Sequence, residues 1–557
     1  MNYSEARSRK SATATASIVR SGAPKIKTMA TTATNIRKDV TRKKRKQPGK
    51  LGPKKAPKAP KKEKAKKRTK KKKRKMAKMR WWACLVVIVC VAVIVTYRGY
   101  VGVYEPTAWT PRARRTSRMM IGYATAPFQN ERPAASARAT MWAEFVHRTR
   151  PPGMHVSPNH AHLATFERDL ARAKRDVPEL NAFRFGVDWA TVEPREGAFD
   201  QAALDAYAEM ARACSSRGIR PVITLHHFVE PAWFSARGSF ASDASVASFA
   251  RFARECARTL GAFRPVFVTL NEPFLYAMHG YGLGIRPPFV RSVATCLEVM
   301  CNLVRAHDAA YDELRHAGPV TIAKNLMPVF PRTTLSPVEV ILAHELHGLV
   351  NAAYLQWVKT RTLNIRFGPI ARSVKTRNTV DVLGVNHYTA ATVRWTGLEV
   401  KLDLCGRYAG ETPMCAANWR LDARALRSTL NMVHATLGNT VPVLFTELGA
   451  PQVEGDKRAR VRYMRDCLAV LAEYAEGTGN LCGVLAWTLV DNFEWELGTS
   501  ARFGHYTIAR RKTALLRLYA KFASRARFGA PIIRDSELSS EDKTPRLVPG
   551  LKQKTTS

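Results

Sequence analysis

Acidic residues are scarce in this chain, most of all near its N-terminus. The 557 residues include 90 lysines and arginines but 44 aspartates and glutamates, a formal net charge of +46. Residues 1–80 hold 31 basic residues and three acids, a net charge of +28, which leaves +18 (46 − 28) for the other 477 residues. Like charges at this density repel one another, and few apolar residues are present to form a core. We therefore predict that residues 1–79 are a disordered, Lys/Arg-rich tail.

Two classes of partner suit such a tail. Clustered cations attract nucleic acid, and they also attract anionic lipid. The simpler interpretation is a solvated cytoplasmic flank that sets the orientation of a membrane segment. We favour this interpretation because of the stretch that follows the tail.

Residues 81–97, WWACLVVIVCVAVIVTY, lack both charge and proline. Seventeen residues is the short end of a membrane-spanning helix, and the aromatic ends suit the two interfaces. A cleaved signal peptide is the alternative, but some 80 residues precede this stretch and no clear small-x-small site follows it. We predict a transmembrane signal-anchor helix at residues 80–100 and a linker at 101–117. The positive-inside bias predicts a cytoplasmic N-terminus and a lumenal or extracellular remainder.

Three short patterns are missing from the rest of the chain. The cysteine spacings match no zinc site, no apolar run leads into a Gly-rich phosphate loop, and no Asn-x-Ser/Thr sequence follows residue 97. These absences argue against a zinc module and a nucleotide-binding sheet, and glycosylation lends the lumenal location no support. The eight cysteines after residue 100 permit disulfides, and Cys405–Cys415 would close a short loop. Ordinary buried thiols are the alternative.

A single theme repeats eight times after the anchor. A short run rich in Val, Ile, Leu or Phe ends in polar residues, and a stretch with helical periodicity usually follows, as at 163–176 and 201–218. Near-continuous apolar runs indicate parallel strands that are buried on both faces. The sequence therefore predicts an α/β fold, a (β/α)8 TIM barrel over residues 118–530 with a flexible C-terminal tail at 531–557. A doubly wound open sheet is the alternative. The eight runs are 119–126, 182–189, 220–227, 265–272, 319–325, 381–388, 441–447 and 483–489.

Polar or aromatic residues close most of these runs. The third ends in His226-His227, the fourth in Asn271-Glu272 and the seventh in Glu447. Asn325 and Asn386-His387-Tyr388 end the fifth and the sixth. In a barrel these ends share one rim, where barrel enzymes place their active sites. One such residue alone would more often be a capping group, but the whole set points to a site.

The motifs around these ends resemble those of glycoside hydrolase family 1, the retaining β-glucosidases and β-galactosidases. TLNEP (269–273) resembles the acid/base motif of that family, and FTELGA (445–450) resembles its nucleophile motif. AWTLVDNFEWELG (486–498) is similar to its sugar-binding segment. FRFGVDWATVEP (183–194), TLHHF (224–228) and GVNHYT (384–389) resemble three further blocks. All six occur in the family's order.

The resemblance implies a role for each matching position. Glu272 would be the general acid/base and Glu447 the nucleophile, with Arg184 and Tyr388 beside the nucleophile. The residues that would hold the non-reducing sugar are Gln129, His227, Asn271, Glu494 and Trp495, with Trp487 beneath its ring. His226 is the alternative to His227 as the inward histidine. Since the acid Glu494 would repel a phosphate group, we expect an unphosphorylated sugar.

Some positions depart from the family pattern. Leu448 replaces the usual Asn after the nucleophile, His387 stands where Tyr is usual, and Phe228 stands where Trp is common. His505-Tyr506 replaces an expected Leu-x-x-Val-Asp. These departures put substrate range and catalytic rate in question, but none of them removes a carboxylate.

The proposed chemistry needs two carboxyl groups on opposite sides of one sugar carbon. In a retaining glycosidase they lie roughly 5–5.5 Å apart, where one protonates the leaving oxygen and the other attacks the anomeric carbon. We expect Arg184 to keep Glu447 ionised and Glu272 to hold its proton more tightly. The mechanism uses carboxylates and water, so no cofactor is implied.

The sequence thus predicts a membrane-anchored hydrolase of terminal non-reducing β-D-glycosides that acts with retention through a covalent glycosyl-enzyme. Two alternatives remain at this stage. A non-catalytic carbohydrate-binding or receptor-like barrel would keep the scaffold without the reaction. A transglycosidase would use the same residues with a sugar acceptor in place of water.

Overall fold

The structure is a computed structural model that describes residues 69–82, 104, 109, 119–131, 140–149, 151, 163–397, 399–404 and 413–528. The chain divides into two compact units, and the unit formed by Gly99–Arg394 and Lys401–Ser557 holds the β-barrel. The flexible tail predicted at 531–557 and most of the predicted anchor lie outside the described residues.

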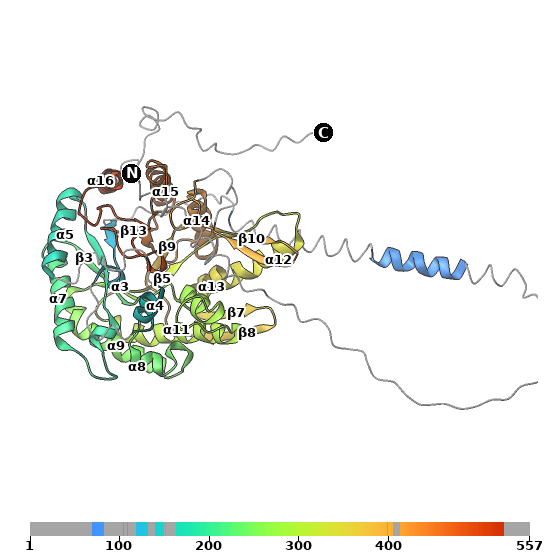
Figure 1. Cartoon of the computed structure of the whole chain (residues 1–557), viewed down its shortest axis with the longest axis horizontal. Helices are drawn as coiled ribbons and strands as arrows, with labels where there is room; N and C mark the ends of the chain where they lie inside the picture. Colours follow the sequence, from blue (N-terminus) through green and yellow to red (C-terminus); the bar gives the residue numbers. More distant parts are fainter. Residues whose placement is uncertain are drawn as a thin grey trace, which may run out of the picture. The chain divides into compact units, whose positions relative to one another are not determined.

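Eight parallel strands close into a barrel in the order β1-β13-β12-β9-β5-β4-β3-β2. Figure 1 shows this barrel with helices around it. All eight predicted runs form its strands, which confirms the barrel and excludes the open sheet. The strands are β1 (Met120–Ala124), β2 (Ala182–Gly186), β3 (Arg220–His226), β4 (Val266–Asn271), β5 (Val320–Asn325), β9 (Leu383–His387), β12 (Val443–Leu448) and β13 (Leu481–Trp487).

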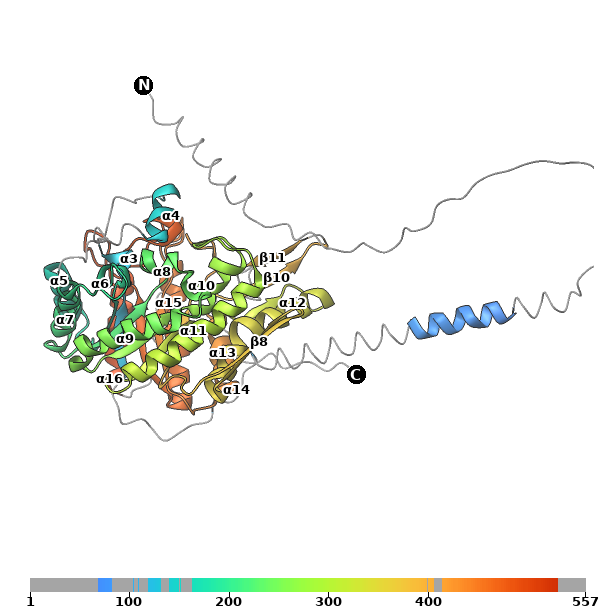
Figure 2. The ribbon, with the colours of Figure 1, turned by 90° about the horizontal axis from the view of Figure 1, so that it is seen from below.

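Helices surround the barrel, and Figure 2 shows α9 and α11 side by side over the strands. The stretch predicted at 163–176 is helix α5, and the one predicted at 201–218 is α7, which ends at Ser215. The long helices are α5 (Leu163–Asp176), α7 (Gln201–Ser215), α9 (Ser245–Leu260), α11 (Val293–Leu314), α14 (Arg424–Leu437), α15 (Ala459–Thr478) and α16 (Ala514–Phe528). The shorter α-helices are α3 (Pro127–Asn130), α4 (Met141–Thr149), α6 (Trp189–Val192), α8 (Ala232–Ala236), α10 (Pro273–Ala277), α12 (Pro337–His347) and α13 (Ala353–Thr360).

Several smaller elements are not part of the eight-stranded barrel. Strands β7 (Thr362–Phe367) and β8 (Ile370–Lys375) form an antiparallel hairpin. A three-stranded sheet has the order β11-β10-β6, from β6 (Val329–Pro331), β10 (Ala391–Trp395) and β11 (Val400–Asp403). Two π-helices, η4 (Met278–Gly282) and η5 (Gly348–Ala352), follow α10 and α12. The 3₁₀ helices are η2 (Ser239–Ala241), η3 (Gly261–Phe263) and η7 (Trp495–Leu497).

The barrel strands form because their residues are apolar and branched and are buried on both faces. Every residue of β2, β4, β12 and β13 is buried. The barrel interior is packed with small and branched side chains such as Ala182, Val222, Val268 and Leu444, as expected for a filled barrel.

Residues 69–82 form a helix, so the prediction of disorder over residues 1–79 is wrong for its last part. Lysine, arginine, methionine and alanine favour helices, and no proline or glycine follows Pro60 in this part of the tail. Within the described residues, no helix is long and apolar enough to cross a membrane. Because residues 83–100 are not among them, the predicted anchor stays a prediction.

Two residues of the predicted linker at 101–117 contact the barrel. Tyr104 is buried, its hydroxyl bonds to Nδ1 of His347, and its backbone oxygen accepts a hydrogen bond from Nδ2 of Asn431 at 3.0 Å. Trp109 donates from Nε1 to Oδ1 of the same Asn431 at 3.2 Å and packs edge-on against Tyr474. Asn431 thus fastens both residues, and at these two points the segment is not a free linker.

Replacing Trp109 by alanine is expected to destabilise the barrel by about 2 kcal/mol, because it removes a partly buried indole, less than the cost of a fully buried one. Thermal or urea unfolding of the full chain measures the change. A variant of the exposed Trp395, Trp395→Ala, is the control and should change stability by less than about 0.5 kcal/mol. Equal stability of the wild type and the Trp109 variant would show that the segment does not hold the barrel.

The described cysteines are buried and form no disulfide within the described residues, as expected for the ordinary buried thiols that the sequence left as an alternative. Cys415 is among them, so it does not form the bridge with Cys405 that the sequence permitted; Cys405 itself lies outside the described residues. Burial raises the pKa of Cys415 to about 11, which keeps the thiol protonated and unreactive at neutral pH.

Candidate active site

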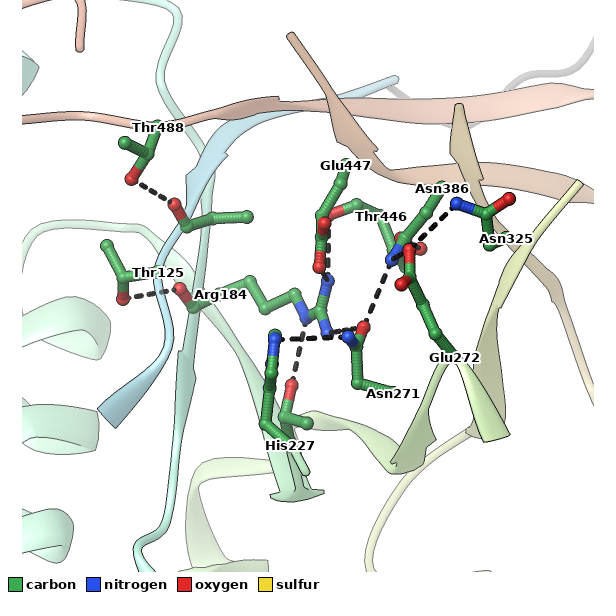
Figure 3. Close-up of polar contacts among 12 residues, drawn as sticks. Thr125, Arg184, His227, Asn271, Glu272, Asn325, Asn386, Thr446, Glu447 and Thr488 are labelled. Carbon is green, nitrogen blue, oxygen red and sulfur yellow. Dashed lines mark hydrogen bonds and ion pairs between the residues drawn. The ribbon is translucent and has the colours of Figure 1, made fainter. Parts of the chain in front are cut away.

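The polar residues at the strand ends gather at one rim of the barrel (Figure 3). Arg184 comes from β2, Asn271 from β4, Asn325 from β5, Asn386 from β9 and Glu447 from β12. These strands are neighbours in the barrel except that β2 reaches the group from across it. The convergence follows from parallel strands, whose carboxyl ends meet at the same face.

Arg184 lies at the centre of this group and is fully buried. Its Nη1 donates to Oε1 of Glu447 at 2.7 Å, and its Nη2 donates to Oδ1 of Asn271 at 2.8 Å. Its Nε is held by Oγ1 of Thr224 at 2.9 Å. The guanidinium is therefore fixed in one orientation, with a carboxyl group on one branch and an amide on the other (Figure 3).

Glu272 is held on the other side of the same group. Nδ2 of Asn386 donates to Oε1 of Glu272 at 3.0 Å and also to Oδ1 of Asn271 at 3.0 Å. Nδ2 of Asn325 donates to the same Oε1 at 3.1 Å. One chain of hydrogen bonds thus runs from Glu447 through Arg184 to Asn271 and on through Asn386 to Glu272. In Figure 3 both glutamates point into this network.

The backbone at Glu272 explains why the strand stops there. Glu272 has φ 47° and ψ 52°, a left-handed conformation that is unusual for a non-glycine residue. Pro273 follows as the first residue of α10, a position that needs no backbone N–H. The strand therefore gives way to a helix at this point, and Glu272 is left at the corner with its side chain toward the network.

Glu447 receives a second donor from Tyr388. The phenol hydroxyl of Tyr388 donates to Oε2 of Glu447 at 2.5 Å, so each carboxyl oxygen has its own partner. Behind the carboxyl group the chain passes very close to β13, because a Cβ on Gly449 would lie 2.1 Å from the backbone oxygen of Trp487. Glycine is thus required there for the chain after Glu447 to pass this close to the backbone of Trp487.

Burial decides the charge of Glu447 more than Arg184 does. The pKa of Glu447 is raised to about 7, chiefly by burial and also by the charge of Glu272, although Arg184 and Tyr388 act to lower it. Near neutral pH, the sequence prediction that Arg184 keeps Glu447 ionised therefore holds for only part of the molecules. The physical reason is that a carboxylate 3% exposed loses its hydration, and one arginine does not restore all of it.

His227, and not His226, faces the network. Nδ2 of Asn271 donates to Nε2 of His227 at 3.1 Å, while His226 packs edge-on against Phe240 and Tyr276. Burial, helped by Arg184, holds the pKa of His227 well below its usual range. The neutral ring accepts at Nε2, so its proton is on Nδ1. This Nδ1 is buried and has no hydrogen-bond partner in the described part of the chain.

Gln129 and Glu494 lie together. Nε2 of Gln129 donates to Oε2 of Glu494 and to the backbone oxygen of Phe493, both at 3.0 Å. Oε1 of Gln129 is buried and has no partner among the described residues. Burial raises the pKa of Glu494 to about 8, Glu447 raises it too, and a hydrogen bond from Trp487 lowers it.

The two tryptophans differ in their surroundings. Trp487 is buried at the end of β13, with the ring of His227 stacked over it at 6.1 Å. Trp495 lies in an aromatic cluster, parallel to Phe128 at 5.6 Å and 4.5 Å from Trp142. All ten residues singled out from the sequence thus lie at the rim or directly against it.

Sequence reasoning missed the bridging role of Asn386 and Asn325. Both were recognised as strand ends, but neither was assigned a place in the site. Oδ1 of Asn386 also accepts from Oγ1 of Thr446 at 2.7 Å, so this asparagine connects three strands. Their position at the ends of strands near Glu272 was a signal that the sequence offered. Only the register of β5 against β9, however, pairs the two asparagines directly.

Three of the residues that depart from the family pattern are packing residues, whereas a fourth, Phe228, contacts His227 and Trp495 of the site. His387 turns to the backbone oxygen of Leu326 and to Thr429, His505 contacts Tyr123, and Leu448 is fully buried. Within the described contacts none of these three touches Glu272 or Glu447. The departures therefore leave the hydrogen-bonded network of both carboxyl groups in place.

Three comparisons with known proteins agree with this geometry. The model of the family "Glycosyl hydrolase family 1" matches residues 116–526. The chain is 25% identical to "Beta-glucosidase A" of Acetivibrio thermocellus over 403 residues, which is 66% of this chain and 86% of that protein. It is also 25% identical to "Beta-glucosidase" of an Agrobacterium species over 427 residues, which is 71% of this chain and 91% of that protein.

Among solved structures, the chain resembles "beta-glycosidase from Pyrococcus horikoshii" with a TM-score of 0.65 and 24% identity. The match covers 76% of this chain and 97% of that one. A "Family 1 b-glucosidase from Thermotoga maritima" matches with a TM-score of 0.62 and 21% identity, over 74% of this chain and 98% of that one. These two structures share the barrel.

Proposed function

The chain belongs to glycosyl hydrolase family 1, and we propose that it hydrolyses terminal non-reducing β-D-glycosides with retention, through a covalent glycosyl-enzyme. That it is a hydrolase of β-glycosides follows from the family and from its β-glucosidase relatives. The observation that supports the mechanism best is the network that holds Glu447 and Glu272 around Arg184 and Asn386.

In the first step Glu447 attacks the anomeric carbon while Glu272 protonates the leaving oxygen. The Glu447 carboxylate forms a bond to the sugar carbon, the bond from that carbon to the leaving oxygen breaks, and the proton of Glu272 moves to that oxygen. Arg184 and Tyr388 hold the two oxygens of Glu447, so the nucleophile does not rotate during the attack.

In the second step Glu272 acts as a base. It is ionised once it has given up its proton, and it takes a proton from a water that attacks the glycosyl-enzyme. The ester bond to Glu447 breaks, and the sugar leaves with its original anomeric configuration. Asn325 and Asn386 each donate to Oε1 of Glu272, and such donors stabilise the carboxylate that this step needs.

The sugar itself would be held by complementary polar atoms. The unpartnered Nδ1 of His227 donates and the unpartnered Oε1 of Gln129 accepts, which suits hydroxyl groups, since each of these both donates and accepts. Trp487 offers an aromatic surface beside them. Glu494 offers carboxyl oxygens to sugar hydroxyl groups and brings no positive charge that would hold a phosphate group, so the expected substrate is an unphosphorylated glycoside.

Trapping with a 2-fluoro glycoside tests the mechanism. We expect the full chain to lose activity with time and a peptide containing Glu447 to carry the label. A 2-fluoro glucoside and a 2-fluoro galactoside, compared at equal concentration, distinguish the two sugars. Labelling of a different residue, or hydrolysis with inversion of the anomeric centre, would contradict the proposal.

The rate should depend on pH through Glu447. Because the nucleophile must be ionised and burial raises its pKa to about 7, kcat/KM for an aryl β-glucoside is expected to fall as the pH drops below about 7. Between pH 7 and pH 5 the loss should be about 50-fold, because Glu447 is half ionised at its pKa and loses tenfold for each pH unit well below it. Initial rates at low substrate concentration measure it. A flat profile between pH 4 and pH 9 would contradict the role of Glu447.

The location of the enzyme is a further part of the proposal. We place residues 1–79 in the cytoplasm, residues 80–100 in a membrane and the barrel on its other side, because of the uncharged stretch at 81–97 and the basic residues before it. Alkaline carbonate should fail to extract the full chain from membranes but should extract an Ile88→Arg variant. The basic tail is expected to bind anionic lipid or nucleic acid, and added salt would weaken either interaction.

A further inference from the structure

A lysine lies in the barrel wall directly behind the acid/base residue. Lys324 is the residue before Asn325 on β5 and is 2% exposed. Side chains alternate along a strand. Ala323 belongs to the barrel interior and Asn325 reaches Glu272, whereas Lys324 points outward to the helices. Within the described residues no carboxylate forms an ion pair with it, which is unusual for a buried ammonium.

The contacts of Lys324 connect it to Glu272 in two ways. Nζ of Lys324 donates to the backbone oxygen of Asn325, whose own side chain donates to Oε1 of Glu272. The same Nζ lies 5.4 Å from the ring centre of Phe274, two residues after Glu272, and 5.9 Å from the ring centre of Tyr354 on α13. Lys324 therefore touches both the partner of Glu272 and the helix that Glu272 begins.

A purely structural role accounts poorly for a lysine at this position. Burying an ammonium without a carboxylate is costly, and contact with two aromatic faces offsets only part of that cost. A methionine or leucine would fill the space between the two rings without that cost. Burial lowers the pKa of Lys324 to about 7, and the charge of Glu272 raises it. The charge of this side chain is thus sensitive to Glu272 within the working pH range.

We propose that Lys324 is a positioning residue for the general acid/base, whose positive charge favours the ionised form of Glu272 from behind Asn325. The inference rests on the role proposed above for Glu272. Its consequence is greatest after the first step, when Glu272 has lost its proton and must remain an anion until water attacks. A nearby cation stabilises that anion, so Lys324 would help to set the upper pH limit of activity.

Other titratable groups face these two residues from the surrounding elements. Glu447, Arg184 and Tyr388 surround Glu272 on the inner side of the wall. On the outer side, burial raises the pKa of Tyr354 far above neutrality and lowers that of His307 in α11 to about 4. Both are neutral near pH 7. On the outer side, and within the described residues, Lys324 is therefore the group whose charge changes in this range.

Two substitutions with opposite charge effects test the inference. Lys324→Met keeps the length and removes the charge, whereas Lys324→Arg keeps a charge at every working pH. For an alkyl β-glucoside, whose leaving group needs a proton, we expect the upper pH limit of kcat/KM to rise by about 0.5–1 unit in the methionine variant. We expect it to fall in the arginine variant. If Lys324 were merely structural, both substitutions would lower kcat, and they would not move the upper pH limit of kcat/KM in opposite directions.

Three controls keep the outcome clear. Lys324→Met should unfold no more easily than the wild type, because it removes a buried charge. Phe274→Leu keeps the lysine but removes an aromatic ring that stabilises its charged form. It should therefore raise the upper pH limit of kcat/KM by a smaller amount than Lys324→Met does. This variant still tests the inference if Lys324→Met fails to fold. With a 2,4-dinitrophenyl β-glucoside, which needs no proton, the Lys324 variants should form the glycosyl-enzyme within about twofold of the wild-type rate.

An unchanged upper limit in both Lys324 variants would overturn the inference. If the 2-fluoro label still appeared on Glu447 in that case, the proposed function would stand and only the role of Lys324 would be lost. If the label were absent from Glu447, the mechanism itself would fail. The two failures are therefore distinguishable in the same set of proteins.

Discussion

Replacing Glu447 by glutamine is expected to reduce the hydrolysis of an aryl β-glucoside by about 10⁵-fold, which corresponds to about 7 kcal/mol of transition-state stabilisation. Glutamine keeps the size of the side chain and an oxygen that can accept from Arg184, at 2.7 Å in the wild type. It cannot form the ester to the sugar, so the first step is lost. Initial rates and the burst of released aglycone measure the effect.

The matched control removes a glutamate that lies outside the network. Glu313 on α11 forms a surface ion pair with Arg254, and such pairs contribute little to stability. Glu313→Gln should keep hydrolysis within about twofold of the wild type. A Glu447→Gln variant that is folded and retains more than a few per cent of the activity would exclude Glu447 as the nucleophile, whereas a folded wild type without any hydrolysis would favour the non-catalytic carbohydrate-binding alternative.

Replacing Glu272 by glutamine is expected to have an effect that depends on the leaving group. For an alkyl or phenyl β-glucoside the first step should slow by about 10³–10⁴-fold, because general acid catalysis contributes an effect of this size. For a 2,4-dinitrophenyl β-glucoside the first step should stay within about tenfold, since that leaving group needs no proton. The glycosyl-enzyme should then accumulate, because its hydrolysis lacks the base.

Added azide distinguishes this role from a structural one. Azide needs no base, so it should attack the accumulated glycosyl-enzyme of Glu272→Gln, restore turnover and give a β-glycosyl azide. The same azide should not rescue Glu447→Gln, which forms no such intermediate. Equal losses for all leaving groups, without rescue, would show that Glu272 only supports the fold of the rim. Glucosyl transfer to added alcohols in the wild type would favour the transglycosidase alternative.

The eight strands and most of the site were predictable from the sequence for a simple reason. Parallel strands buried on both faces appear in a sequence as continuous apolar runs. Polar residues at the ends of such runs are therefore easy to identify. Glu272 and Glu447 were recognised in this way although 175 residues (447 − 272) separate them. The choice between His226 and His227 stayed open, because neighbouring residues on a strand end cannot be told apart without the barrel.

The sequence by itself determined the barrel, the two carboxyl groups and most of their companions, because strand periodicity and local motifs depend on residues near one another in the chain. Only the tertiary structure decided which groups touch. It placed Asn386 between Asn271 and Glu272, fixed the proton of His227, and set Lys324 behind Asn325. It also left Glu447 only partly ionised near neutral pH, where the sequence predicted the ionised form, since the loss of hydration at a buried carboxylate depends on everything packed around it and outweighs the one arginine visible in the motif.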